Sequence, residues 1–145
     1  NGNDDITVGW SDNGAQTVSY TIQPSTSGIT TSLSRNNNEL VEGVEAMQIR
    51  YGVCTTDANG DGVNDSVTPP YVNAAAVTAA GNWGNVCSVR IDLRMVSLED
   101  NITTSTQTLV FPADTGNSFT PNPVDRRLRQ GFSTTVVIRN RILLP

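Results

Sequence analysis

The chain has 145 residues, enough for one domain with a buried core, and a formal net charge of -5 at pH 7. Its basic residues are all arginines, and it contains no histidine. Because phosphate binding needs a basic face, this balance argues against nucleic acid as a main partner. The lack of histidine excludes Ser-His-Asp and Cys-His catalysis and histidine-ligated zinc or iron. No acidic pair lies in an apolar setting, so we expect a protein that is not an enzyme.

Membrane and secretion signals are absent from the sequence as it stands. No run of about twenty apolar residues occurs, and the opening segment NGNDDITVGW lacks the charged and apolar regions of a signal peptide. We therefore expect a soluble chain that folds as one domain over residues 1–145.

Apolar and polar residues alternate along most of the chain, which predicts a mainly β protein with an antiparallel sheet. The Asn13-Gly14 pair supplies the positive φ angles of a tight turn and predicts a hairpin between the first two strands. The predicted strands are Ile6–Trp10, Thr17–Gln23, Met47–Val53, Val86–Val96 and Phe132–Ile142.

The strand predicted over Val86–Val96 has the clearest alternation, VCSVRIDLRMV. Its apolar residues share one side, which we expect to be buried, while Arg90, Asp92 and Arg94 share the other and should face solvent. An outward row of charges also discourages aggregation through a sheet edge.

Two segments predict helical structure. In NNNELVEGVEAM the apolar residues Leu40, Val41, Val44 and Met47 recur at helical spacing after an asparagine cap, which predicts a short helix or helical turn. The alanine-rich YVNAAAVTAAGNW predicts a second helical turn. Trp10 and Trp83 are expected in the core rather than in a ligand platform.

The segment TTDANGDGVNDS follows the pattern D-x-N-x-D-G-x-x-D, in which oxygens at alternate positions converge on one ion. We expect a structural Ca²⁺ there. Pro69-Pro70 forbids the exit helix of an EF-hand. The alternative is a polar turn without an ion, but the repulsion among its acids favours a cation. The predicted ligands are Asp57, Asn59, Asp61, Val63 through its carbonyl, and Asp65.

Cys54 and Cys87, the two cysteines, flank this loop, so a disulfide between them would tie its base. In the chain-entropy model, such a bond stabilises the fold by about 3 to 4 kcal/mol. It also implies an oxidising compartment outside the cytoplasm. By alternation, Cys54 lies on the same side of its strand as Gln48 and Arg50, whereas Cys87 lies on the same side as the apolar Val89. A bulge or a strand end must therefore bring the two cysteines together. The alternative is two buried free thiols.

Several segments occur in an order that resembles one family. NELVEGVEAMQIRYGV is followed by the TDANGDGVNDS loop, by NVCSVRIDLRMVS and finally by DRRLRQGFSTTVVIRNR. Each motif alone is weak, but together they are similar to the globular part of a PilW-type minor pilin of type IV pili. The resemblance also implies homology to the J-type pseudopilin of type II secretion.

The resemblance implies a pilin-like fold, α+β when complete, in which the sheet packs against a long N-terminal helix that anchors the precursor in the inner membrane. That helix is not in this sequence, so one sheet face should be apolar and exposed. The implied role is a minor pilin that primes assembly at or near the tip and supports adhesion, twitching motility or DNA uptake. The implied partners are other pilin subunits and a tip adhesin, in the periplasm and the extracellular pilus.

Other roles stay open from the sequence. The chain could be a major filament-forming pilin, a secretion pseudopilin or a secreted calcium-dependent binding module. The arginines of DRRLRQ fit either a contact patch for acidic pilin faces or, in the preferred interpretation, a solvated turn before the last strand. Arg139 and Arg141 share one face of that strand and could meet carboxylates on a neighbouring strand or subunit.

Overall fold

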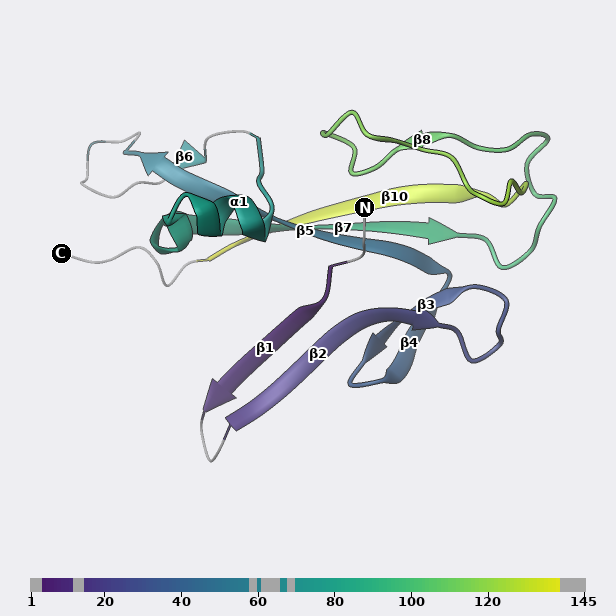
Figure 1. Ribbon diagram of the computed structural model, residues 1–145, viewed down its shortest axis with the longest axis horizontal. Coiled ribbons are helices and arrows are strands. Elements are labelled where there is room, and N and C mark those ends of the chain that lie inside the picture. The colour runs from purple at the N-terminus through teal and green to yellow at the C-terminus, as the bar shows by residue number, and fades with distance from the viewer. Residues whose placement is uncertain (1–3, 12–14, 58–59, 61–65, 68–69, 139–145) are drawn as a thin grey trace. The chain divides into compact units, whose positions relative to one another are not determined.

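A computed structural model describes residues 4–11, 15–57, 60, 66–67 and 70–138. This part of the chain is mainly β, with antiparallel strand pairs and one short α-helix (Figure 1). The strands form two four-stranded sheets, with orders β1-β2-β3-β4 and β10-β7-β5-β6, and a two-stranded β8-β9 sheet. The predicted fold class is confirmed.

The elements in chain order are β1 (Ile6–Ser11), β2 (Ala15–Pro24), β3 (Thr31–Arg35), β4 (Asn38–Glu42), β5 (Val44–Thr56), β6 (Ser66–Val67), α1 (Ala74–Ala79), the 3-10 helix η1 (Asn82–Asn85), β7 (Val86–Val96), β8 (Leu109–Val110), β9 (Ser118–Phe119) and β10 (Arg129–Val137).

The chain divides into two compact units. The first holds the described residues up to 48 together with 93–132, and the second holds 49–92 and the described residues from 133 onward. The division falls inside β5, β7 and β10, so each of these strands contributes residues to both units.

The first unit contains the predicted N-terminal hairpin. β1 and β2 pair antiparallel from Ile6 opposite Tyr20 to Ser11 opposite Ala15. Their predicted turn residues, Asn13 and Gly14, lie outside the described residues. β2 continues into an antiparallel pair with β3, and β3 pairs with β4.

The helix predicted over NNNELVEGVEAM is wrong, because this segment forms β4 and the start of β5. Asn36 and Asn37 have φ of 49° and 64°, and the flanking Arg35 and Asn38 face each other across β3 and β4. Positive φ at both central residues is the requirement of a type I′ hairpin turn, so the asparagines form a turn instead of capping a helix. Leu40, at an expected buried position, is exposed.

Gly43 joins β4 to β5 and explains why the chain changes direction there. Its φ is 82°, and a Cβ at this position would lie 2.7 Å from the carbonyl oxygen of Val96. The backbone N–H of Val96 donates to the Gly43 carbonyl at 2.7 Å. A side chain would disrupt this close approach, so glycine is required. The buried apolar residues of the first unit are Val18, Val44, Ala46, Met47, Val96 and Phe111.

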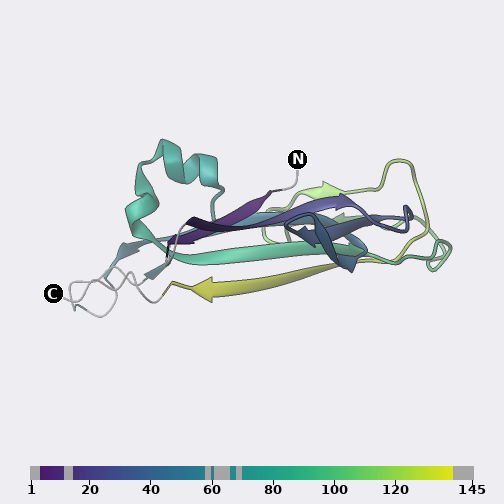
Figure 2. The same cartoon turned by 90° about the horizontal axis from the view of Figure 1, so that it is seen from below.

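The second unit contains α1 and η1. α1 begins at Asn73, whose side-chain oxygen accepts the backbone N–H of Ala76 at 2.9 Å. This capping confirms the helical turn predicted for the alanine-rich segment. Val77 of α1 is fully buried, and Figure 2 shows the helix standing over one face of the strands. The buried apolar residues of this unit are Ile49, Cys54, Val77 and Val86.

Trp83 is not the core residue that we expected. It is 40% exposed, and its ring packs edge-on against Tyr51 with centroids 5.0 Å apart. Its indole N–H donates to Oγ1 of Thr78 at 3.0 Å, which ties η1 to the end of α1. A surface position lets the indole keep a polar partner while its ring still covers an aromatic neighbour. The side chain of Trp10 lies outside the described residues.

β10 is an edge strand among the described strands, and its side chains are more exposed than the sequence suggests. It begins at Arg129, earlier than the predicted Phe132, while the predicted end at Ile142 and both Arg139 and Arg141 lie outside the described residues. Phe132 and Val136, on one side of the strand, and Val137, on the other, are all exposed, so the exposed apolar side chains of β10 are not confined to a single face.

Candidate functional site

The predicted cation loop lies between β5 and β6, in the second unit. Its first ligand, Asp57, accepts the backbone N–H of Gly60 on Oδ1 at 2.6 Å. The other predicted ligands, Asn59, Asp61, Val63 and Asp65, lie outside the described residues. Within the described part of the chain, no three His, Cys, Asp or Glu residues gather closely enough to hold a metal.

The predicted disulfide is present. Cys54 and Cys87 are bonded with their Cα atoms 5.8 Å apart, a normal separation for a disulfide. Cys87 lies at the start of β7, and Cys54 lies beside a register shift between β5 and β6. The strand end at Cys87 and the register shift at Cys54 explain how two cysteines expected on opposite sides of their strands can meet. The bond links the end of β5 to the start of β7, on either side of the loop, as expected from the positions of the two cysteines in the sequence.

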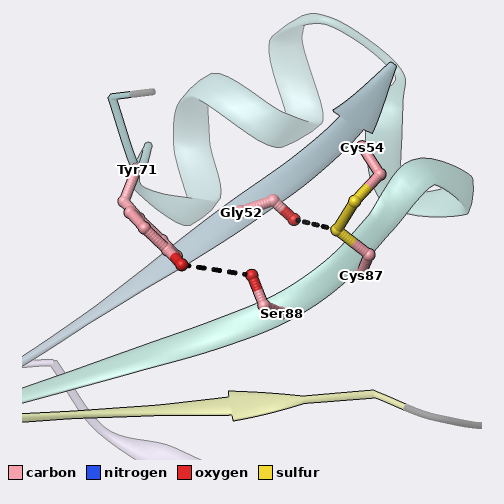
Figure 3. The surroundings of a disulfide bond; sticks show 5 residues. All are labelled: Gly52, Cys54, Tyr71, Cys87 and Ser88. Carbon is pink, nitrogen blue, oxygen red and sulfur yellow. Dashed lines mark hydrogen bonds between the residues drawn. A yellow bond between two sulfur atoms is a disulfide. The ribbon is translucent and has the colours of Figure 1, made fainter. Parts of the chain in front are cut away.

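The strands beside the disulfide approach each other closely (Figure 3). Sγ of Cys87 lies 3.4 Å from the Gly52 carbonyl oxygen, and the Ser88 hydroxyl lies 3.5 Å from the hydroxyl of Tyr71. A Cβ at Gly52 would overlap Oγ of Ser88 and contact the Tyr71 ring. The absence of a side chain at Gly52 therefore gives Ser88 and Tyr71 their places next to the bond.

A buried ion-pair cluster lies in the same unit, centred on Asp92. The Asp92 side chain is 1% exposed, and Oδ2 is 3.0 Å from Nη2 of Arg50, whose side chain is also buried. Oδ1 is 3.1 Å from Nε of Arg90 and accepts the hydroxyl of Ser133. Both carboxylate oxygens are thus held by charged or hydroxyl donors.

This cluster overturns the prediction that Arg90, Asp92 and Arg94 form a solvent-facing row. Asp92 is buried, and the side chains of Arg90 and Arg94 are only 18% and 12% exposed. Alternation along a strand separates its two faces but does not say which face the rest of the chain covers. Charged residues can occupy a covered face when neighbouring strands supply partners of opposite sign.

The first unit holds a second ion-pair cluster, made by Arg129, Glu45, Asp125 and Arg94. The Arg129 side chain is 3% exposed and binds two carboxylates, Glu45 at 2.8 Å from Nη2 and Asp125 at 2.5 Å from Nη1. Nε of Arg94 lies 3.0 Å from Oε2 of Glu45. Arg129 therefore belongs neither to a contact patch nor to a solvated turn, the two alternatives that the sequence left open for DRRLRQ.

The charges of this cluster shift one another's pKa values. Hydrogen bonds from Arg129 hold the pKa of Asp125 below its ordinary value. The same bonds, with those to Glu45, raise the pKa of Arg129. Burial lowers the pKa of Arg94, although its bond to Glu45 opposes that shift. The shifts of Asp125 and Arg129 both favour the charged form, so this pair stays ionised at neutral pH.

These clusters were missed because each strand was considered alone. β5 carries Glu45 and Arg50, and the adjacent β7 carries Arg90, Asp92 and Arg94. Two neighbouring strands with charges of opposite sign are the pattern of cross-strand pairing, and this pattern is visible in the sequence. To predict these ion pairs from the sequence, one would have to know that β5 and β7 are neighbours in the sheet.

The family of this chain can be identified by comparison with known proteins. Among the described residues, no helix is both long and apolar enough to span a membrane. The model of the PilW family, described as type IV pilus-assembly protein W, matches residues 11–140. No match was found among curated proteins or among solved structures. Because the family match covers most of the sequence and runs through both units, the chain belongs to the PilW family of type IV pilus-assembly proteins.

Proposed function

We propose that this protein is a minor pilin, a subunit that joins other minor pilins, primes assembly of a type IV pilus and lies at or near its tip. It acts in the periplasm before assembly and outside the cell afterwards. Adhesion, twitching motility or DNA uptake would then depend on it through the filament. The observation that carries the proposal is the family match over residues 11–140, which ties the chain to pilus assembly.

Two structural features support this role. A disulfide fits a subunit that matures outside the cytoplasm, where such bonds persist. The exposed apolar side chains of β10 fit a sheet that is covered by a partner, for which we propose the N-terminal helix of the complete pilin. The contacts of such a subunit would be with other pilins and, at the tip, with an adhesin.

The test is deletion of the gene in the bacterium that encodes it, with surface pili counted by electron microscopy. A priming subunit predicts few or no pili, restored by the wild-type gene supplied elsewhere on the chromosome. Gold-labelled antibody against the protein should mark filament ends in the restored strain. Label along the whole filament would identify a major pilin, and a normal number of unlabelled pili would contradict a pilus role.

We further propose that Asp57, Asn59, Asp61, the Val63 carbonyl and Asp65 bind a structural Ca²⁺. Support comes from the ligand pattern in the sequence and from the orientation of the Asp57 carboxylate by the Gly60 N–H. The disulfide at the loop base would reduce the conformational freedom that ion binding has to overcome. The ion would stiffen a surface loop and take no part in catalysis.

We expect calcium at a hundred times its dissociation constant to stabilise the protein by about 2.7 kcal/mol over chelator, since it binds the folded state alone. Thermal unfolding of the oxidised protein measures this. Asp61→Asn should abolish the shift, and Glu99→Gln, a change of an exposed carboxylate elsewhere, should retain it. An equal shift in wild type and Asp61→Asn would contradict the site.

A further inference from the structure

The strongest feature left unexplained is a pocket of about 400 Å³ in the first unit, beside the ion-pair cluster. Arg94, Arg127 and Arg129 line it together with Glu45 and Asp125. Three guanidinium groups against two carboxylates leave one positive charge in the lining. This is unusual in a chain whose net charge is -5.

The lining charges are unevenly matched. Arg129 is fully engaged, because its guanidinium contacts both oxygens of Glu45 and both oxygens of Asp125 at 2.5 to 2.9 Å. Glu45 also accepts Nε of Arg94. Both carboxylates are thus bonded to Arg129 or Arg94, and Asp125 also accepts the backbone N–H of Arg127 at 3.2 Å, but neither forms a hydrogen bond with the Arg127 side chain.

Arg127 supplies the third positive charge, which Asp100 and Asp125 feel electrostatically without a close ion pair. Its Nη1 donates to the backbone carbonyls of Ser97, at 2.8 Å, and Leu98, which are neutral acceptors. Its side chain forms no ion pair with any carboxylate among the described residues. The bonds to the loop hold the guanidinium in place at the pocket wall.

Arg94 supplies a second set of donors. Its guanidinium lies over the Phe119 ring, 3.4 Å from the ring centroid, and its bond to Glu45 uses Nε. The two terminal nitrogens have no hydrogen-bond partner among the described residues. A guanidinium fixed by an aromatic face and one carboxylate loses little freedom when it binds a further acceptor.

A neighbouring pocket of about 340 Å³ indicates which chemical group a ligand would carry beside its anionic group. It shares Glu45, Asp125 and Arg129 with the first pocket, and Phe119, Pro121 and Pro123 form its apolar wall. A charged pocket next to an apolar one suits a ligand that carries an anionic group beside an apolar group.

We propose that the two pockets bind an acidic peptide segment, with the carboxylate of an Asp or Glu at Arg94 and Arg127 and an apolar neighbour against Phe119. A carboxylate suits the site because arginine nitrogens bind it in a planar, bidentate manner and its single charge equals the excess of the lining. A phosphate dianion would exceed that charge and be repelled by Glu45 and Asp125. The inference does not depend on the filament role.

The test is a fluorescence-anisotropy titration with a labelled, end-capped pentapeptide that has a phenylalanine next to a central glutamate. Because hydrogen bonds to charged groups contribute about 1.5 to 3 kcal/mol, Arg127→Gln and Arg94→Gln should each weaken binding by about tenfold or more. Arg35→Gln, which removes an exposed arginine from β3 in the same unit, should leave affinity within about twofold. Thermal unfolding of each variant verifies that it is folded.

Two further arms identify the ligand chemistry. The glutamine version of the peptide should bind at least about tenfold more weakly, because it lacks the charge. Acetate should compete only at much higher concentration, since it cannot reach the apolar pocket. Equal binding of the glutamate and glutamine peptides, or unchanged affinity in Arg127→Gln, would overturn the proposal. Competition by acetate as effective as by the peptide would overturn the assignment to a peptide.

Discussion

Asp92→Asn is expected to lower the free energy of unfolding by about 3 to 5 kcal/mol, because it removes a buried negative charge that lies 3.0 Å from the guanidinium of Arg50. The asparagine amide retains the shape of the carboxylate and one acceptor oxygen. The loss of stability therefore reflects the missing charge rather than a change in packing. Urea denaturation followed by circular dichroism measures the change as a fall in the midpoint at constant slope.

Two variants make this prediction specific. Asp5→Asn removes an exposed carboxylate that forms no ion pair with another described residue, and should change stability by less than about 0.5 kcal/mol. Arg50→Met combined with Asp92→Leu replaces the pair by apolar groups and should be more stable than Asp92→Leu alone. A double variant as unstable as the single one would show that packing, not unpaired charge, determines the loss.

The second large effect is expected from the disulfide. Cys54→Ser combined with Cys87→Ser should destabilise the protein by about 3 to 4 kcal/mol, because the unfolded chain regains the freedom of a loop that spans 33 positions. Cys54 is buried, so part of the loss will come from placing a hydroxyl there. Comparison with Cys54→Ala combined with Cys87→Ala separates that contribution.

The slope of the unfolding free energy against urea concentration gives an independent measure of what the disulfide does. Without the cross-link the unfolded state exposes more surface, so the slope should rise in both double variants. Reduction of the wild-type protein should reproduce the alanine result, and Asp5→Asn, a change of an exposed side chain in the first unit, should leave the slope unchanged. A reduced protein with the midpoint and slope of the oxidised one would show that the bond adds no stability.

Sequence patterns predicted the features that depend on short segments. The pairing of β1 with β2, the β7 strand and the helical turn at α1 follow from alternation and from alanine content, both of which act over a few residues. The disulfide needed only two cysteines at the ends of neighbouring strands.

The errors came from contacts that a single segment does not contain. Asn36 and Asn37 suit both a helix cap and a hairpin turn, and pairing of β4 with β3 decided between them. The burial of Asp92 depends on Arg50 in another strand, and the surface position of Trp83 on Tyr51. The cation loop stays a prediction, since most of its ligands lie outside the described residues.

The edge-on packing of Trp83 against Tyr51 makes the second unit its own fluorescent reporter. The indole is partly exposed, and Tyr51 lies in the same strand as Cys54. The chain has two tryptophans, and the other, Trp10, belongs to β1. In a Trp10→Phe background, tryptophan emission therefore originates in η1 of the second unit alone, so that opening of this unit can be timed separately from unfolding of the first.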